Sequence, residues 1–179
     1  MKKNSQLISF PDGITLESGY FLNSFDLMIE SYGELNESKS NAILVCHAFS
    51  GNHHVAGEDK ELGTGWWDQI VGPDKALDTN KYYVVCCNNL GGCAGSSGPN
   101  TINPDTNKIY GSAFPQVSVE DWVKSQKMLM DKLNIPYWEM VAGGSLGGMQ
   151  ALQWTIAYPN KVKRAVSYTH LTLPTNREV

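Results

Sequence analysis

The residues most able to do chemistry lie in the stretch MVAGGSLGGMQALQW, at positions 140–154. Ser145 lies there between glycines, after an apolar run and before a helix-like pattern, and residues 143–147 fit G-x-S-x-G. In such a strand-to-helix turn, glycines let neighbouring backbone approach closely, and the serine hydroxyl stays exposed. The pattern predicts a nucleophile at Ser145. The alternative is a plain glycine-rich turn, because the five residues alone are common by chance.

A nucleophilic serine also needs donors for the negative charge that develops on the attacked oxygen. A helix beginning after Ser145 would offer free N–H groups and a positive dipole end, so the backbone N–H of Leu146 is one candidate. The second donor is expected in the loop after an early strand, where the sequence reads HAFSG at 47–51. The backbone N–H of Phe49 is our candidate there.

A base and an acid for Ser145 are harder to find. With this turn, the acid and then the histidine follow the serine in the chain. After Ser145 the sequence has no aspartate, and its one histidine (His170) precedes its one glutamate (Glu178). His53 and His54 could form a base or a metal pair, but adjacent histidines do not easily converge on one ion, which favours loop or pocket roles. We therefore expect no metal, and we expect the triad Asp and His to be absent from this chain.

The elements that position these residues are predicted from hydrophobic patterns. Continuous apolar runs at 41–47, 82–88 and 137–143 predict strands buried on both faces, as in a parallel sheet. Residues 13–32 alternate as strand material, and 162–166 opens another strand.

Two helices are predicted between strands. The first is capped by Ser118 with Asp121 and ends at Asn134, and the second follows Ser145 and stops at Pro159. Their expected apolar positions are Val119, Trp122, Val123, Gln126, Leu129, Met130 and Leu133 in the first, and Leu146, Met149, Leu152 and Ile156 in the second. This alternation predicts an α/β fold with a mainly parallel sheet. Glycine-rich loops at 47–57 and 88–104 follow strand ends, where such sheets bind ligands.

Composition limits the classes of function. The 179 residues are 41% hydrophobic and 18% charged, which is typical of one globular domain. The net charge is −4 without a basic block, which argues against nucleic acid. No apolar run approaches a membrane span and no signal peptide is evident, so a cytoplasmic protein is expected. The cysteines lack zinc or redox spacing and are expected to be buried thiols, with Cys86 and Cys87 on opposite strand faces; the four are Cys46, Cys86, Cys87 and Cys93.

Several longer motifs resemble one family. The segments CHAFSGNHHVAG, GWWDQIVGPDKALDT, NNLGGCAGSSGPNTINP, YGSAFPQVSVEDWVKSQ and GGSLGGMQALQW are similar, in order and spacing, to the homoserine O-acyltransferases of the MetX type. The resemblance covers residues 10–166. It implies an α/β-hydrolase fold and a ping-pong reaction in methionine biosynthesis. An acyl-CoA would acylate Ser145, and the acyl group would pass to the side-chain hydroxyl of L-homoserine.

The resemblance also assigns roles and partners. Phe49 and Leu146 align with the family's oxyanion donors, and the substrate pocket is expected to include Gly51, Asn52, Asn89 and Gly91. The variants SGNHH and NNLGGCAGSSGP are more similar to the succinyl-using branch than to the acetyl-using one. Acyl-CoA is a substrate, so no cofactor is implied. The full-length protein would be a homodimer.

The sequence departs from the family after Val166. Family members continue with a helical lid and then the triad Asp and His, whereas this sequence reads SYTHLTLPTNREV. We therefore expect 1–166 to be the N-terminal part of a C-terminally truncated α/β-hydrolase domain, without the lid and last strands, and 167–179 to be a non-native tail. We expect the chain alone to be inactive and poorly soluble.

Two other functions stay open. A serine esterase or other hydrolase could use the same turn, because fold and function are only loosely coupled. A non-catalytic binding module could keep the pocket and lack the base. Dinucleotide binding is disfavoured, because no G-x-G-x-x-G lies in a strand–turn–helix setting.

Overall fold

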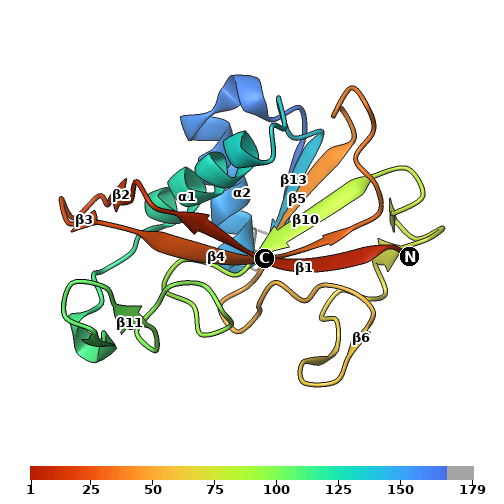
Figure 1. Cartoon of the computed structure of the whole chain (residues 1–179). Helices are drawn as coiled ribbons and strands as arrows, with labels where there is room; N and C mark the ends of the chain where they lie inside the picture. Colours follow the sequence, from red (N-terminus) through yellow and green to blue (C-terminus); the bar gives the residue numbers. More distant parts are fainter. Residues whose placement is uncertain (169–179) are drawn as a thin grey trace, which may run out of the picture.

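A computed structural model describes residues 1–168, and its main element is a six-stranded sheet with the order β1-β4-β10-β5-β13-β14 (Figure 1). Strands β10, β5, β13 and β14 are parallel to one another, and β4 pairs antiparallel with both β1 and β10. The prediction of a mainly parallel sheet is thus confirmed. The strands are β1 (Lys3–Phe10), β4 (Phe25–Tyr32), β5 (Ala42–Cys46), β10 (Tyr83–Cys87), β13 (Met140–Gly144) and β14 (Ala165–Tyr168).

Helices α1 (Val119–Lys132) and α2 (Leu146–Ala157) lie together on one face of this sheet (Figure 1). The predicted cap of α1 is present, because the Ser118 side chain accepts from the Asp121 amide and the Asp121 side chain accepts from the Ser118 amide. This capping box satisfies two backbone donors that the first helical turn leaves free. Short 3-10 helices, η1 (Gly111–Ala113) and η2 (Pro159–Lys161), complete the helical segments of residues 1–168.

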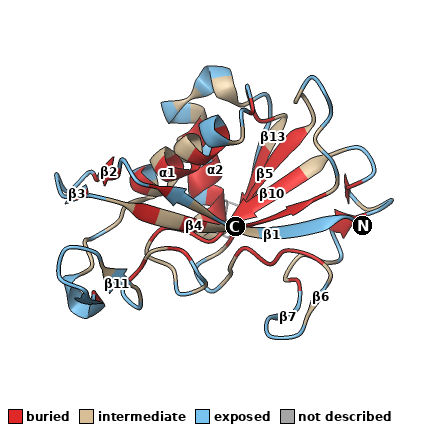
Figure 2. Cartoon of the chain, viewed as in Figure 1, coloured by how far each residue is buried: buried red, intermediate tan, exposed pale blue. Residues whose placement is uncertain are grey.

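The central strands are buried on both faces (Figure 2). In β5, Leu44 faces the core under α1 and α2, whereas Val45 faces a second core on the opposite side. Cys87 and Cys86 divide in the same way, as their adjacent positions predicted. No helix in the described residues covers the second face. The long connection between β5 and β10 packs Val55, Ala56, Val71 and Leu77 against it.

Short two-stranded pairs account for much of the connecting chain, and the sequence patterns did not predict them. Within residues 13–32, only 25–32 form a full strand, β4. Residues 14–22 form a small hairpin, because the chain turns back on itself there. Strand β1 was also missed, since it lies at the sheet edge with mostly exposed residues and gives no apolar run. The short strands are β2 (Ile14–Thr15) with β3 (Phe21–Leu22), β6 (Glu58–Asp59) with β7 (Gly63–Thr64), β8 (Val71–Gly72) with β9 (Leu77–Asp78), and β11 (Ile102–Asn103) with β12 (Lys108–Ile109).

The predicted inner face of α2 is wrong, although the helix itself is confirmed. Leu152 and Ile156 are exposed, at 50% and 73%. The buried face instead carries Gly147, Ala151 and Trp154 together with the polar Gln150. Small residues are needed there because α2 packs closely on β13 and β5.

Two further expectations concern cysteines and membranes. All four thiols are free, and Cys46, Cys86 and Cys87 are buried, but Cys93 is exposed, which corrects the expectation of four buried thiols. Cys93 lies in an irregular loop after β10 rather than in a strand. Within residues 1–168, no helix has the length and apolar character needed to cross a bilayer.

We expect Ser118→Ala to lower the free energy of unfolding by about 1 kcal/mol, because the mutant loses the side-chain half of the capping box. Urea unfolding monitored by circular dichroism measures this. Ser112→Ala is the matched control, since Ser112 is exposed and makes no side-chain hydrogen bond within residues 1–168. Equal midpoints for the two variants would contradict the assigned cap.

Candidate active site

Ser145 lies at the junction of β13 and α2 with φ 56° and ψ −124°. Residues other than glycine rarely adopt such a backbone conformation. It costs on the order of 1–3 kcal/mol and persists only where the surrounding structure imposes it. The Ser145 side chain makes no capping hydrogen bond to α2. The predicted strand–turn–helix setting is therefore present, with a strained serine at its apex.

Two glycines make this turn possible. A Cβ atom on Gly147 would lie 2.0 Å from the Cys46 carbonyl oxygen, and one on Gly143 would lie 2.3 Å from the Gly147 carbonyl oxygen. Both distances are far below van der Waals contact. The G-x-S-x-G pattern is thus explained by close backbone approach between the end of β5, β13 and the start of α2.

Strand register brings the predicted loops to the turn. Gly143 pairs with Cys46, and Val45 pairs with Cys86, so three parallel strands end at the same sheet edge. The loops that follow β5 and β10 therefore begin beside Ser145. This is the edge at which α/β sheets bind ligands.

A cavity of about 710 Å³ lies at this edge. The structure brings six of the seven predicted site residues to its wall; they are Phe49, Gly51, Asn52, Asn89, Gly91 and Leu146. The seventh, Ser145, directly precedes Leu146. Within residues 1–168, neither the Phe49 nor the Leu146 amide N–H donates to a protein acceptor. Both donors are therefore available to a ligand.

His47 connects two of these loops. Its Nδ1 lies 2.7 Å from the Ala48 carbonyl oxygen, and its Nε2 accepts a hydrogen bond of 3.1 Å from the Asn89 amide. Because a carbonyl only accepts and an amide N–H only donates, the ring carries its proton on Nδ1 and is neutral. Burial lowers the His47 pKa, and the nearby His53 acts in the same direction. His47 therefore has a structural role and no free nitrogen for catalysis.

His54 belongs to a buried polar cluster with Glu30 and Tyr32. Its Nδ1 lies 2.7 Å from Glu30 Oε2, and its Nε2 faces the carbonyl oxygens of Gly57 and Gly63 at 3.2 and 3.0 Å. The Tyr32 hydroxyl donates to the same Glu30 oxygen. Both ring nitrogens of His54 are thus occupied, which argues against a base there.

His53 does not line the cavity, and its buried Nδ1 has no hydrogen-bond partner within the described chain. Burial lowers its pKa, partly offset by Glu30. No group of three or more His, Cys, Asp or Glu side chains in residues 1–168 could hold a metal ion.

Sequence reasoning predicted the two loops of the cavity wall but missed the part that comes from α1 and from residues 114–117. Trp122 comes from α1 and donates from Nε1 to the Leu90 carbonyl oxygen at 2.8 Å, which ties the helix to the loop after β10. The helical pattern predicted only a packing role for Trp122. Asn88 and Leu90 belong to the loop at 88–104, which the sequence placed at a ligand-binding strand end. The additional lining residues include Asn88, Leu90, Phe114, Val117 and Trp122.

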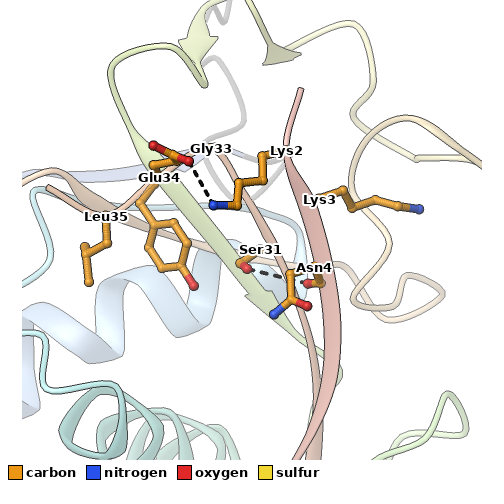
Figure 3. Close-up of a pocket in the computed structure, with 8 residues that line it drawn as sticks. Lys2, Lys3, Asn4, Ser31, Gly33, Glu34 and Leu35 are labelled. Atoms are coloured by element: carbon orange, nitrogen blue, oxygen red, sulfur yellow. Dashed lines mark hydrogen bonds and ion pairs between the residues drawn. The ribbon is translucent and has the colours of Figure 1, made fainter.

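A second hollow, of about 540 Å³, lies at the opposite end of the sheet, where β10 begins at Tyr83 (Figure 3). Its wall carries the ion pair between Lys2 Nζ and Glu34 Oε1, at 2.8 Å, and both side chains are largely exposed. It lies at the other end of the sheet from the strand ends that meet Ser145, and Ser145 does not line it. We therefore place the candidate active site at the other cavity.

A family model described as the alpha/beta hydrolase fold matches residues 41–176, which include the turn at Ser145. The chain belongs to the α/β-hydrolase family. The fold predicted from the sequence is thus confirmed. The prediction of a non-native tail at 167–179 falls mostly outside the described residues. Ser167 and Tyr168 belong to β14, whereas His170, Glu178 and the rest of 169–179 lie outside the described residues.

Two curated relatives illustrate the similarity. The homoserine O-succinyltransferase of Hahella chejuensis is 60% identical over 164 residues, covering 89% of this chain and 42% of the relative. The homoserine O-succinyltransferase of Neisseria meningitidis is 61% identical over 165 residues, covering 90% of this chain and 43% of the relative. These relatives confirm the predicted resemblance. The chain spans less than half of their length.

Two solved structures are similar in fold. A homoserine O-acetyltransferase from Bacillus anthracis superposes with a TM-score of 0.85 at 35% identity, covering 92% of this chain and 46% of that one. Esterase E22 superposes with a TM-score of 0.84 at 38% identity, covering 91% and 46%. Acyltransferases and esterases thus both resemble this chain.

We expect Gly147→Ala to destabilise the protein by about 3 kcal/mol, because its Cβ would overlap the Cys46 carbonyl. Urea unfolding measures the change. Leu152→Ala is the control on the same helix, since half of that side chain is already exposed. Similar losses for the two variants would be inconsistent with the close approach of α2 to β5.

Acid stability should depend on Glu30. Although burial raises its pKa, hydrogen bonds from Ser5, Tyr32 and His54 hold it below the usual 4.5. Ionised Glu30 therefore stabilises the fold above pH 4.5, and this contribution is lost as the pH falls through the lower, folded-state pKa.

We expect Glu30→Gln to lose on the order of 3 kcal/mol of unfolding free energy at pH 7 and less in acid. Urea midpoints across the pH range provide the measurement, with Glu34→Gln in the exposed pair as the control. An unchanged pH dependence in the Glu30 variant would show that the carboxylate does not contribute in this way.

Proposed function

We propose that this chain carries the nucleophile part of a homoserine O-succinyltransferase, which transfers a succinyl group from succinyl-CoA to L-homoserine. The observation that carries the proposal is the strained Ser145, next to a cavity where two backbone amides have no acceptor within residues 1–168. The names of relatives at 60–61% identity support the reaction class.

In the proposed first step, Ser145 Oγ attacks the thioester carbonyl carbon of succinyl-CoA. A base takes the hydroxyl proton, and the N–H groups of Leu146 and Phe49 stabilise the negative oxygen. The C–S bond then breaks, CoA leaves as the thiol with that proton, and a succinyl ester remains on Ser145.

In the second step, the homoserine hydroxyl attacks the ester carbonyl. The C–O bond to Ser145 breaks, O-succinylhomoserine leaves, and the serine regains its proton. In this fold the acid and the histidine follow the serine in the chain. We therefore assign the base and its acid to the part of the relatives' length that this chain does not span.

The cavity wall suits such substrates. Neutral polar groups line the wall at Asn52, Asn89 and Gly91. Trp122 and Phe114 add apolar surface for an acyl chain. Phe49 is 87% exposed at this wall, as expected for an aromatic ring that a substrate covers. Succinyl-CoA is favoured over acetyl-CoA by the relatives' names, and acetyl transfer is the second candidate because of the Bacillus anthracis structure.

A serine esterase is the alternative function, and the similarity to esterase E22 favours it. The same acyl-serine would then be attacked by water. A non-catalytic binding module is disfavoured, because it would not need the backbone strain at Ser145. For the transferase we further propose a cytoplasmic homodimer that needs no cofactor, since acyl-CoA is its substrate.

The test uses the full-length protein, in which this chain would be the N-terminal part. We expect release of CoA thiol from succinyl-CoA to require L-homoserine, and Ser145→Ala to lower kcat by on the order of 10⁴-fold or more. Ser112→Ala, at an exposed serine of η1, should keep wild-type activity. Thiol release is followed with a chromogenic disulfide, and the acylated amino acid by mass spectrometry.

The outcomes separate the candidates. Thiol release that is fast without homoserine and yields free succinate would identify a hydrolase. Faster turnover with acetyl-CoA than with succinyl-CoA would identify the acetyl branch. Full activity of the Ser145 variant would refute the acyl-serine mechanism.

A further inference from the structure

The buried cluster around Glu30 lies outside the cavity, and the proposed chemistry does not use it. Glu30, Tyr32 and His54 are each at most 2% exposed. Glu30 Oε1 accepts from Ser5 Oγ at 2.6 Å and lies 3.5 Å from Lys3 Nζ, while Oε2 contacts the tyrosine and the histidine. Burying a carboxylate lowers stability unless hydrogen bonds satisfy its lone pairs. The four contacts of Glu30 therefore offset the free energy of burying it.

Every polar atom at the centre of the cluster is engaged. His54 Nε2 faces two carbonyl oxygens and therefore carries a proton. One hydrogen bond joins its Nδ1 to a Glu30 oxygen that also accepts from the Tyr32 hydroxyl. The histidine ring is thus held at both nitrogens.

The cluster is connected to the cavity through the loop after β5. Tyr32 Oη accepts from the amides of Val55 and Ala56 at 2.8 and 3.1 Å, which fixes the end of that loop on β4. The His54 amide donates to Asn52 Oδ1 at 2.8 Å.

Asn52 is held from several sides. The Asn52 carbonyl oxygen accepts from Trp66 Nε1 at 3.0 Å. With its side-chain oxygen engaged by His54, the Asn52 Nδ2 group is the part of this cavity-lining side chain without a partner in residues 1–168.

We propose that Glu30 and His54 are positioning residues, which hold the Asn52 carboxamide with its N–H donors toward an oxygen of the bound substrate. This inference rests on the proposed function, since it assumes that substrate occupies the cavity. Neither residue touches the substrate. Their effect passes through the loop, so it should be visible only while Asn52 is present.

A double-mutant cycle in the full-length protein tests whether Glu30 acts through Asn52. We expect Glu30→Gln and Asn52→Ala each to lower kcat/KM for succinyl transfer by about 10- to 100-fold, because a misplaced positioning group costs that much. The double variant should lose no more than Asn52→Ala alone, because residues acting through one contact are not additive. Glu34→Gln, in the exposed pair with Lys2, is the matched control and should match wild type.

Two independent outcomes would overturn the proposal. One is wild-type kcat/KM in Glu30→Gln, and the other is a double variant whose loss equals the product of the single losses. Where Glu30→Gln does not fold, Tyr32→Phe removes the hydroxyl that anchors Val55 and Ala56, and the same cycle with Asn52→Ala applies.

Hydrogen exchange separates this proposal from the proposed function. We expect faster amide exchange at 53–57 in Glu30→Gln than in Glu34→Gln, whatever substrate the enzyme uses. If the wild-type protein proves to be an esterase, the cycle is measured on ester hydrolysis instead. Unchanged exchange at 53–57 would refute the positioning role even where succinyl transfer is established.

Discussion

The candidate site depends on the close approach of the Cys46 carbonyl oxygen, at the end of β5, to the backbone of Gly147, at the start of α2. A side chain at 147 would overlap that oxygen, so α2 reaches its place only with glycine there. This contact fixes where the helix begins and how sharply β13 must turn into it. The strained conformation of Ser145 follows, and so does its position beside the loop that leaves β5. The nucleophile and its candidate amide donors are therefore consequences of one steric constraint.

Two buried networks keep the surrounding loops in place at this edge. His47 joins the loop after β5 to the loop after β10 by accepting from the Asn89 amide. Farther in, Gln126 of α1 accepts from Trp154 Nε1 and donates to Gln150 Oε1, which ties α1 to α2. A polar network inside a core is costly unless each member is satisfied. The polar Gln150 on the inner face of α2 is thus explained, because it helps to hold the helix that follows Ser145 against α1.

Parts of this structure were predictable because burial determines sequence there. Strands β5 and β10 are buried on both faces and give continuous apolar runs, and the Ser118 cap has a local signature. Strand β1 was not predictable, since its exposed residues carry no such pattern. The cavity wall falls between these cases. Its position after the strand ends follows from the sheet, but the contributions of Phe114 and Trp122 depend on how distant segments of the chain pack against those loops.

The histidines show most clearly what a sequence leaves undecided. His47 and His54 lie seven positions apart in one loop, yet their contacts differ. The Asn89 amide donates to His47 Nε2, whereas the His54 ring is held between Glu30 and the Gly63 carbonyl oxygen. Neither ring has a nitrogen left to take a proton from Ser145, and His53 does not line the cavity. None of these three histidines is therefore placed to act as the general base in the proposed acyl transfer.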